Sequence, residues 1–106
     1  MFNKFEEYKV PCVKRDWQDY RECFKFPNNY GASVIKGLYS HGGTAGRYEL
    51  AVLVFHGDNF SLCYDTPITD DVLGWQSEQD ILDVLERIKN LPEADYAHDA
   101  EDQEEA

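Results

Sequence analysis

The sequence predicts an α+β fold, in which a small antiparallel sheet of three or four strands forms a meander and a C-terminal amphipathic helix packs on it. Three observations indicate this architecture. Apolar residues alternate through the middle of the chain, Gly-rich segments separate the alternating runs, and an apolar stripe with helical spacing follows them. The chain has 106 residues, 42% hydrophobic and 14% aromatic, which is enough for one folded domain without disulfide bonds.

The strongest strand pattern lies in the middle of the chain. Residues 32–40 predict one strand, and the Gly-rich stretch 41–46 turns the chain into a second strand at 47–56. Both faces of the second strand are apolar. It is therefore expected at the centre of the sheet.

A third strand is expected at residues 60–66, after a tight turn at 57–59 whose residues tolerate positive φ. The alternation in this strand predicts that Phe60, Leu62 and Tyr64 face the core. The proline that follows is expected to end the strand pairing.

Two helical segments are expected after the sheet. Residues 69–74 predict a single turn with a threonine cap and Gly74 at its end. Residues 77–91 predict the main helix, in which Ser77 caps the first turn and Asp80 completes a capping box. Its apolar residues gather on one side, which is expected to lie on the sheet.

The N-terminal segment fits a short helix at residues 16–24, because Trp17, Tyr20 and Phe24 would share one face. The alternation at 24–26 also fits a strand, but the helix is the preferred interpretation. The folded domain is expected to span residues 1–92. Residues 93–106 contain seven acids and no Lys or Arg, and are expected to form a disordered acidic tail.

Acidic residues outnumber basic residues by 21 to 10, which gives a formal charge of −11. Residues 1–36 carry a net charge of +2 and residues 37–106 a net charge of −13. Such a charge repels phosphate groups, so direct binding to nucleic acid or to a membrane is not expected. The chain shows no apolar run of membrane-spanning length and no secretory signal, which predicts a cytoplasmic location.

Three cysteines are present: Cys12, Cys23 and Cys63. The number is odd and no pair has the C-x-x-C spacing. This argues against a disulfide framework and against a cysteine zinc site. Free thiols in a reducing compartment are expected.

The Gly-rich loop at residues 41–47 (HGGTAGR) is the most enzyme-like segment, because backbone amides freed by glycine can hold phosphate. A phosphate-binding loop opens a helix and continues into Gly-Lys-Ser/Thr, whereas this loop enters a strand. A plain exposed connection between strands is the favoured interpretation.

Nucleophilic catalysis would require Cys63 beside a histidine, with His56 or His41 and Asp65 as candidates. Their spacing enforces no contact, and Cys63 lies between two residues that are expected to face inward. A small apolar core residue is the favoured interpretation of Cys63.

Metal binding by Asp65, Asp70 and Asp71 is conceivable, because hard cations prefer carboxylate oxygens. The calcium-loop pattern is absent, and turn formation and helix capping account for two of these residues. No metal and no cofactor are expected.

The acidity itself can be explained in two ways. A solvated acidic surface can simply keep a small protein dispersed. Alternatively, carboxylates on a rigid frame with neighbouring aromatic anchors can match a basic groove that otherwise holds nucleic acid.

Several runs between Tyr30 and Leu91 resemble a group of small acidic proteins that are frequent in bacteriophage genomes. These runs are YGASVI, a Gly-Gly pair with YELAVL, and DTPITDDVLGW before an acidic amphipathic helix. The resemblance covers 62 of the 106 residues. The group has no assigned activity, so the resemblance implies a phage setting rather than a mechanism.

Together with the charge, the resemblance implies a non-enzymatic inhibitor of the anti-CRISPR or anti-restriction type, used in anti-defence or host takeover. Such a protein occludes a basic nucleic-acid-binding surface of a host protein, such as a nuclease. The residues expected to bind this partner are Asp58, Asp65, Asp70, Asp71, Glu78, Asp83, Glu86, Tyr39 and Trp75.

Two alternatives remain at this level, beside a structural or assembly accessory that has no inhibitory role. One is an immunity protein or antitoxin that neutralises a basic nuclease toxin. The other, of a different class, is a small enzyme that uses Cys63 or the loop 41–47. The sequence leaves the oligomeric state open.

Overall fold

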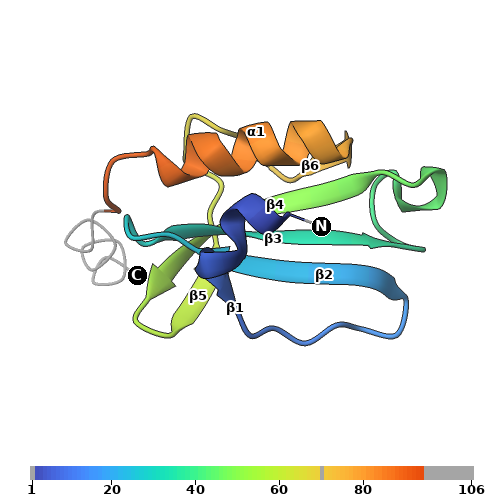
Figure 1. Cartoon of the computed structure of the whole chain (residues 1–106), viewed down its shortest axis with the longest axis horizontal. Coiled ribbons are helices and arrows are strands. Elements are labelled where there is room, and N and C mark those ends of the chain that lie inside the picture. Colours follow the sequence, from blue (N-terminus) through green and yellow to red (C-terminus); the bar gives the residue numbers. More distant parts are fainter. Residues whose placement is uncertain (1, 70, 95–106) are drawn as a thin grey trace.

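Six antiparallel strands and one α-helix form two layers in the computed structural model of the chain, which describes residues 2–69 and 71–94 (Figure 1). The strand order is β1-β2-β3-β4-β5, and β6 also pairs with β4. The elements in chain order are η1 (Asn3–Tyr8), β1 (Lys9–Val10), β2 (Gln18–Lys25), β3 (Tyr30–Gly37), η2 (Gly43–Ala45), β4 (Tyr48–His56), β5 (Asn59–Leu62), β6 (Leu73–Gln76) and α1 (Glu78–Lys89). The predicted α+β class with a C-terminal helix on an antiparallel sheet is confirmed, although the sheet has more strands than expected.

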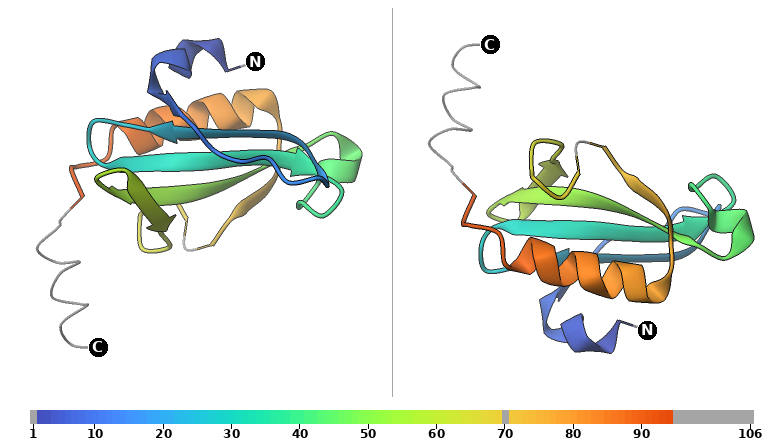
Figure 2. Two further views of the ribbon diagram at one scale, coloured as in Figure 1. Left: turned by 90° about the horizontal axis from the view of Figure 1, so that it is seen from below. Right: turned by 90° about the horizontal axis from the view of Figure 1, so that it is seen from above.

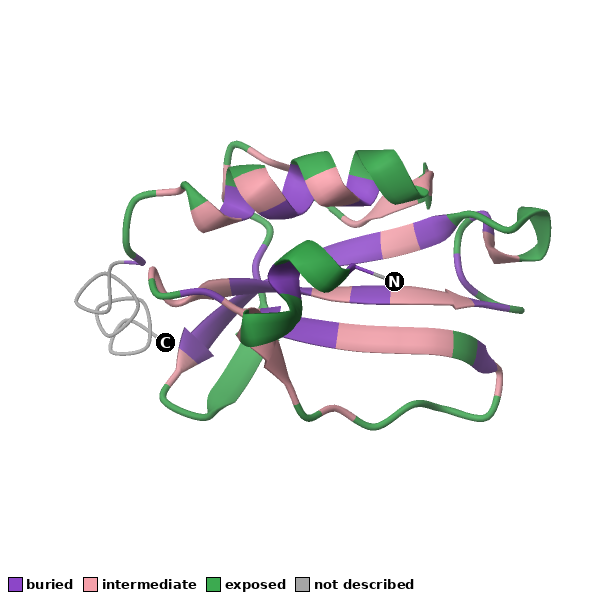
Figure 3. Ribbon diagram, in the orientation of Figure 1, coloured by how far each residue is buried: buried purple, intermediate pink, exposed green. Residues whose placement is uncertain are grey.

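β4 is the central strand, and both of its faces are buried. One face packs against α1 through Tyr48, Leu50, Val52 and Val54, and the other carries Ala51, Leu53 and Phe55. Figure 3 shows this burial along β4. The central position predicted from its two apolar faces is confirmed.

β5 and β6 share one edge of β4. β5 pairs with residues 53–56 of β4, and β6 pairs with residues 48–50. Because β3 occupies the other edge of β4 over the same residues, β5 and β6 act as one edge strand with a break. Residues 63–72 leave the sheet at this break. We call β5, this connection and β6 the interrupted edge.

α1 begins at the capping box predicted from the sequence. Ser77 Oγ accepts a hydrogen bond from the Asp80 backbone N–H (3.1 Å), and Asp80 Oδ2 accepts one from the Ser77 N–H (2.9 Å). The helix buries one side against β3, β4 and β6, through Ile81, Val84, Leu85 and Ile88. The structure therefore confirms the main predicted helix, with bounds slightly inside residues 77–91.

The turn between β2 and β3 holds the end of α1. Asn28 Nδ2 donates to the carbonyl oxygens of Ile88 (2.8 Å), Lys89 (3.2 Å) and Leu91 (2.9 Å). The Ile88 carbonyl also accepts from the Leu91 N–H (3.1 Å), and the Asn28 side chain adds a donor to all three carbonyls of the helix end. The Asn28 carbonyl in turn accepts from the N–H of Ala94, which is buried. The rest of the predicted acidic tail, residues 95–106, lies outside the described residues.

The N-terminal segment covers the part of the sheet that α1 does not reach. Phe2 and Phe5 are buried, and the Phe5 ring meets the rings of Phe24 (6.5 Å between centroids) and Phe26 (6.0 Å). Phe2 and Phe5 belong to the same hydrophobic core as α1.

The helix predicted at residues 16–24 is wrong, because most of this segment forms strand β2. The short helical turn of the N-terminal region lies earlier, at η1. Trp17, Tyr20 and Phe24 do have helical spacing, but pairing with the strongly β-forming β3 satisfies the backbone groups along one edge of β2. Tertiary pairing overrode a weak helical pattern.

Two further predictions at the interrupted edge are wrong. Gly74 does not end a helical turn but lies within β6. Phe60, Leu62 and Tyr64 do not face the core and remain 40%, 53% and 43% exposed. Phe60 and Leu62 share the sheet face of Phe55 and Leu53, which α1 does not cover, so their alternation marks an uncovered face.

The segment between β1 and β2 crosses the sheet face opposite α1, as Figure 2 (left) shows. Arg21 Nη1 anchors it by donating to the Val13 carbonyl (2.7 Å). This segment therefore covers part of the sheet face opposite α1. The end of the same face near β5 remains uncovered.

Replacing Asp80 with asparagine is expected to destabilise the protein at pH 7 and to have a smaller effect in acid. The Ser77 backbone N–H lowers the pKa of the Asp80 carboxyl below its ordinary 3.8. The stabilisation is therefore present above pH 3.8 and is lost as the pH falls through the lower native pKa. Urea unfolding of Asp80→Asn and the natural protein at pH 7 and pH 3 measures the difference.

Asp83→Asn is the matched control, because Asp83 is an exposed acid on the same helix that caps nothing. An Asp80→Asn effect that is equally large at both pH values would contradict the capping role of the carboxylate.

Replacing Asn28 with alanine is expected to lower the free energy of unfolding by about 2 kcal/mol, because three helix-end carbonyls lose the hydrogen bond from the Asn28 amide. Amide hydrogen exchange should show the last turn of α1 opening more readily than its first turn. Equal exchange at both ends of α1 would argue that Asn28 is not the C-terminal anchor.

Candidate functional site

The predicted acidic residues lie on two neighbouring parts of the fold. Asp58 lies in the turn between β4 and β5, and Asp65 and Asp71 lie in the connection 63–72. Glu78 and Asp83 lie on α1, and all five side chains are exposed. We call these five residues the acidic edge. Asp70, also predicted, lies outside the described residues.

The charge of this region is one-sided. Residues 48–86 contain nine acids and no Lys or Arg. Among the residues that the structure describes, no Lys or Arg forms an ion pair with any member of the acidic edge. The carboxylates of the acidic edge therefore face solvent without an ion pair to offset their charge.

Glu86 differs from the other predicted acids. Lys4 and Lys89 lie 3.1 Å and 3.2 Å from its carboxylate, and the hydrogen bond from Lys4 is the main cause that lowers its pKa. Its charge is already matched by the protein's own lysines. Glu86 therefore belongs to the link between η1 and α1 rather than to the acidic edge.

Basic residues are paired at the opposite edge of the sheet. Lys9 of β1 forms ion pairs with Glu6 (2.9 Å) and with Glu22. The hydrogen bond with Glu22 is the main cause that raises the pKa of Lys9. The two edges of the sheet therefore differ in charge. Both acidic and basic residues occur at β1 and β2, whereas the charged residues of the interrupted edge are all acidic.

The two predicted aromatic anchors are exposed, at 73% for Tyr39 and 63% for Trp75. The Tyr39 ring rests edge-on against Trp17 (5.6 Å), a residue that the sequence analysis did not select. Trp75 lies in β6 with φ +59°, a conformation that a bulky residue rarely adopts. Its N–H donates to the His41 carbonyl (3.0 Å), which fixes the strained backbone.

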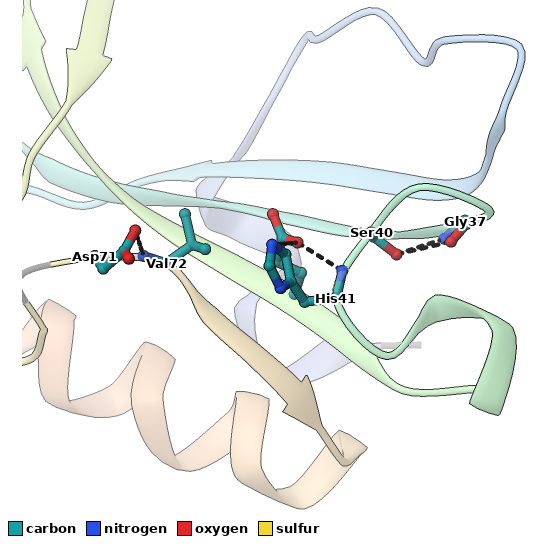
Figure 4. Close-up of polar contacts among 6 residues, drawn as sticks. Gly37, Ser40, His41, Asp71 and Val72 are labelled. Carbon is teal, nitrogen blue, oxygen red and sulfur yellow. Dashed lines mark hydrogen bonds and ion pairs between the residues drawn. The ribbon is translucent and has the colours of Figure 1, made fainter.

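The Gly-rich loop uses its own amides. Backbone N–H groups that could have held phosphate instead donate within the protein: His41 to Glu49, Gly43 to Ser40, Ala45 and Arg47 to Gly42, and Gly46 to Gly43. Figure 4 shows the His41–Glu49 contact and the hydrogen bond between Ser40 and Gly37 in the preceding turn. Positive φ at Gly42 and Gly46 permits these turns. The loop is a structural connection in this conformation.

Cys63 is buried in the core, and its Sγ donates to Asp65 Oδ1 (3.0 Å). Its N–H donates to the Val52 carbonyl, so Cys63 lies opposite Val52 on β4. His56 lies four residues beyond Val52 on β4. At the usual rise of a strand, these two positions of β4 are about 13 Å apart. The structure does not bring Cys63 and His56 into a nucleophile–base contact.

Metal ligands do not gather in the described part of the chain. Within residues 2–69 and 71–94, no group of three His, Cys, Asp or Glu side chains is placed to hold a metal ion. Asp71 Oδ1 accepts a hydrogen bond from the Val72 N–H (2.7 Å), as Figure 4 shows, so one of its oxygens stabilises the turn.

A groove that no sequence pattern predicted lies on the open face of the sheet, with a volume of about 370 Å³. It is lined by Val10, Pro11, Lys25, Phe55, Asp58 and Phe60. The sequence did contain one indication of an open face. β4 has two apolar faces, but the chain has only one long amphipathic helix, which can cover only one of them.

A second cavity, of about 230 Å³, lies beside β1 and brings Cys12 and Cys23 together. Burial, followed by a hydrogen bond with Cys12, raises the pKa of the Cys23 thiol to about 11. The two thiols were expected to be free, and neither forms a disulfide here.

Comparisons with protein-family models, curated proteins and solved structures give no significant match to this chain. The resemblance to phage proteins thus stays a prediction. Within the described part of the chain, no helix is long and apolar enough to cross a membrane.

Cys23 is expected to react far more slowly than Cys12 with iodoacetamide at pH 8. A thiol with a pKa of about 11 is about 0.1% thiolate at that pH, and Cys23 is also 1% exposed. Peptide mapping by mass spectrometry gives each rate. The Cys23 rate should rise with pH between 7 and 9, and the two rates should converge in denaturant, whereas equal rates in the folded protein would contradict this assignment.

Proposed function

We propose that this chain is a small non-enzymatic binding protein that occupies a basic, normally nucleic-acid-binding surface of a host protein. In this proposal it acts in the host cytoplasm as an anti-defence or host-takeover inhibitor, of the anti-CRISPR or anti-restriction type. The observation that carries the proposal is the acidic edge: exposed carboxylates along one side of the fold, with no basic ion-pair partner among the described residues.

Unpaired carboxylates on rigid elements can be matched to phosphate positions in a basic groove. Asp58 stands in the turn between β4 and β5, and Asp65 and Asp71 stand in the connection between β5 and β6, both of which pair with β4. The other two acids stand on the capped helix α1. Their field steers a basic partner toward this side and repels nucleic acid that competes for the same groove.

An exposed aromatic residue supplies the apolar contact that such an interface needs. Trp75 lies in β6, between the acids of the connection and Glu78 at the start of α1. Tryptophan is frequent among the residues that dominate interface energy. Its constrained backbone lowers the entropy lost when a partner binds it.

The phage setting comes from the sequence resemblance between residues 30 and 91. Residues 65–75 of that resemblance contain most of the connection and of β6, and with them four of the candidate partner-binding residues. The resemblance and the acidic edge therefore refer to the same part of the chain.

The test compares two triple variants that change the net charge equally. Asp58→Lys/Asp71→Lys/Asp83→Lys alters the acidic edge, and Glu7→Lys/Asp16→Lys/Asp19→Lys alters exposed acids elsewhere. Tagged proteins are used to capture proteins from bacterial cells that contain defence nucleases, at low and high salt and with competing DNA. The natural protein should retain a basic nucleic-acid-binding protein that high salt or DNA releases.

Titration of that partner should show binding at least about tenfold weaker for the acidic-edge variant and nearly unchanged for the control variant. If the two variants lost the same amount of binding, the effect would be explained by net charge alone. Unchanged binding in both would remove the basis of the proposal.

A further inference from the structure

β5 is the most exposed strand of the sheet. All four of its residues are exposed, and two of them, Phe60 and Leu62, are large apolar side chains on the sheet face opposite α1. Within the residues that the structure describes, β5 is the last strand on its side of β4, so no further strand pairs with its outer edge.

The register shows which backbone groups this outer edge presents. The Cys63 N–H donates to the Val52 carbonyl (2.8 Å), which makes Cys63 and Val52 a hydrogen-bonded pair. Bonded and non-bonded pairs alternate along an antiparallel ladder, so Ser61 also bonds to β4. The N–H and C=O groups of Phe60 and Leu62 therefore point away from β4, ready to pair with another strand.

The groove of about 370 Å³ lies next to this edge. Phe55 and Phe60, whose rings are 5.4 Å apart, lie on one side, and Val10 and Pro11 lie on the other. The Lys25 ammonium lies over the Phe55 ring (5.4 Å) and donates to the Gly57 carbonyl, so it is occupied within the protein. An apolar surface thus continues from the groove onto the open strand.

Acids stand at both ends of β5. Asp58 comes immediately before the strand and Asp65 follows it by three residues, and neither has a basic partner among the described residues. An exposed apolar edge flanked by unpaired carboxylates matches a strand that carries apolar side chains on one face and basic residues on the other.

We propose that β5 is a docking site for an extended basic segment of a partner protein, which adds to the sheet as a strand beside β5. This inference rests on the proposed function and specifies how the partner binds. Partner residues opposite Phe60 and Leu62 exchange backbone hydrogen bonds with them and share their sheet face. Apolar residues are expected at those positions, with Lys or Arg at the positions between them.

A second copy of this chain is a poorer occupant of the same edge. Two β5 strands paired antiparallel about a two-fold axis would bring Asp58 of one copy within about two positions of Asp65 of the other. Neither carboxylate has a basic ion-pair partner in the described structure, so the contact between the two like charges would be repulsive. The charge at the ends of β5 therefore selects a basic partner.

The probe is the peptide acetyl-Lys-Val-Lys-Val-Lys-Val-Lys-amide, titrated into the full chain labelled with ¹⁵N. Binding should protect the amide protons of Phe60 and Leu62 from hydrogen exchange. The Ser61 amide proton, already bonded to β4, should change little. This difference between neighbours reports strand addition rather than general contact.

Two control peptides separate the contributions. N-methylation of the three valines removes the donors that face β5 and should weaken binding at least about tenfold. Replacement of every lysine with glutamine should also weaken binding, and more strongly at low salt. Equal binding of the N-methylated peptide overturns strand addition, and equal binding of the glutamine peptide overturns the basic partner.

A pair of variants locates the site without disturbing the core. Leu62→Ser should weaken peptide binding severalfold, whereas Leu38→Ser, which changes an equally exposed leucine outside β5, should not. Equal effects of the two variants, or no peptide binding at all, overturn the proposal. Concentration-dependent protection of Phe60 and Leu62 without peptide would overturn it in favour of a second copy.

Failure of this inference is distinguishable from failure of the proposed function. If the acidic-edge variant loses the captured host protein while Leu62→Ser retains it, the acidic surface binds the partner without strand addition. If the peptide adds to β5 but the acidic-edge variant retains the host protein, the strand site exists and the proposed mode of inhibition is wrong.

Discussion

The burial of β4 on both faces is the constraint from which the remaining structure follows. A strand with apolar residues at nearly every position must be covered on two sides and paired along two edges. β3 takes one edge, and β5 and β6 divide the other. α1 and the N-terminal phenylalanines cover one face. The second face is covered only in part, which leaves the groove and the exposed side chains of β5.

The position of α1 depends on a single polar residue as well as on apolar burial. Asn28 satisfies the carbonyls at the end of α1, while its own backbone receives the N–H of Ala94. The helix is therefore fixed at its start by the capping box and at its end by the β2–β3 turn. This fixed helix places Glu78 and Asp83 at set positions relative to the interrupted edge.

The division of charge follows from the topology. Basic residues occur mainly in the first third of the chain, which forms β1, β2 and η1, and two of them, Lys4 and Lys9, form ion pairs with acids. Residues 57–76 contain acids but no Lys or Arg, and their strands β5 and β6 pair with the other edge of β4. A protein with this arrangement presents different surfaces to a partner at its two edges, and the open backbone of β5 lies on the acidic one.

The sequence by itself determined the local and strongly patterned features. The two apolar faces of β4, the capping box at Ser77 and the amphipathic stripe of α1 each depend on neighbouring residues, so their patterns can be read without the fold. The excess of acid was equally evident, although the pairing of Glu86 with Lys4 was not, because these residues are far apart in the chain.

Tertiary structure decided the features that depend on distant segments. Residues 18–25 became a strand because β3 was available to pair with them, and Phe60 and Leu62 became exposed because α1 covers the other face. Alternation shows which residues share a face, but it cannot show whether another element will cover that face. The groove and the acidic edge arise in the same way, since each combines segments that only the folded sheet brings together.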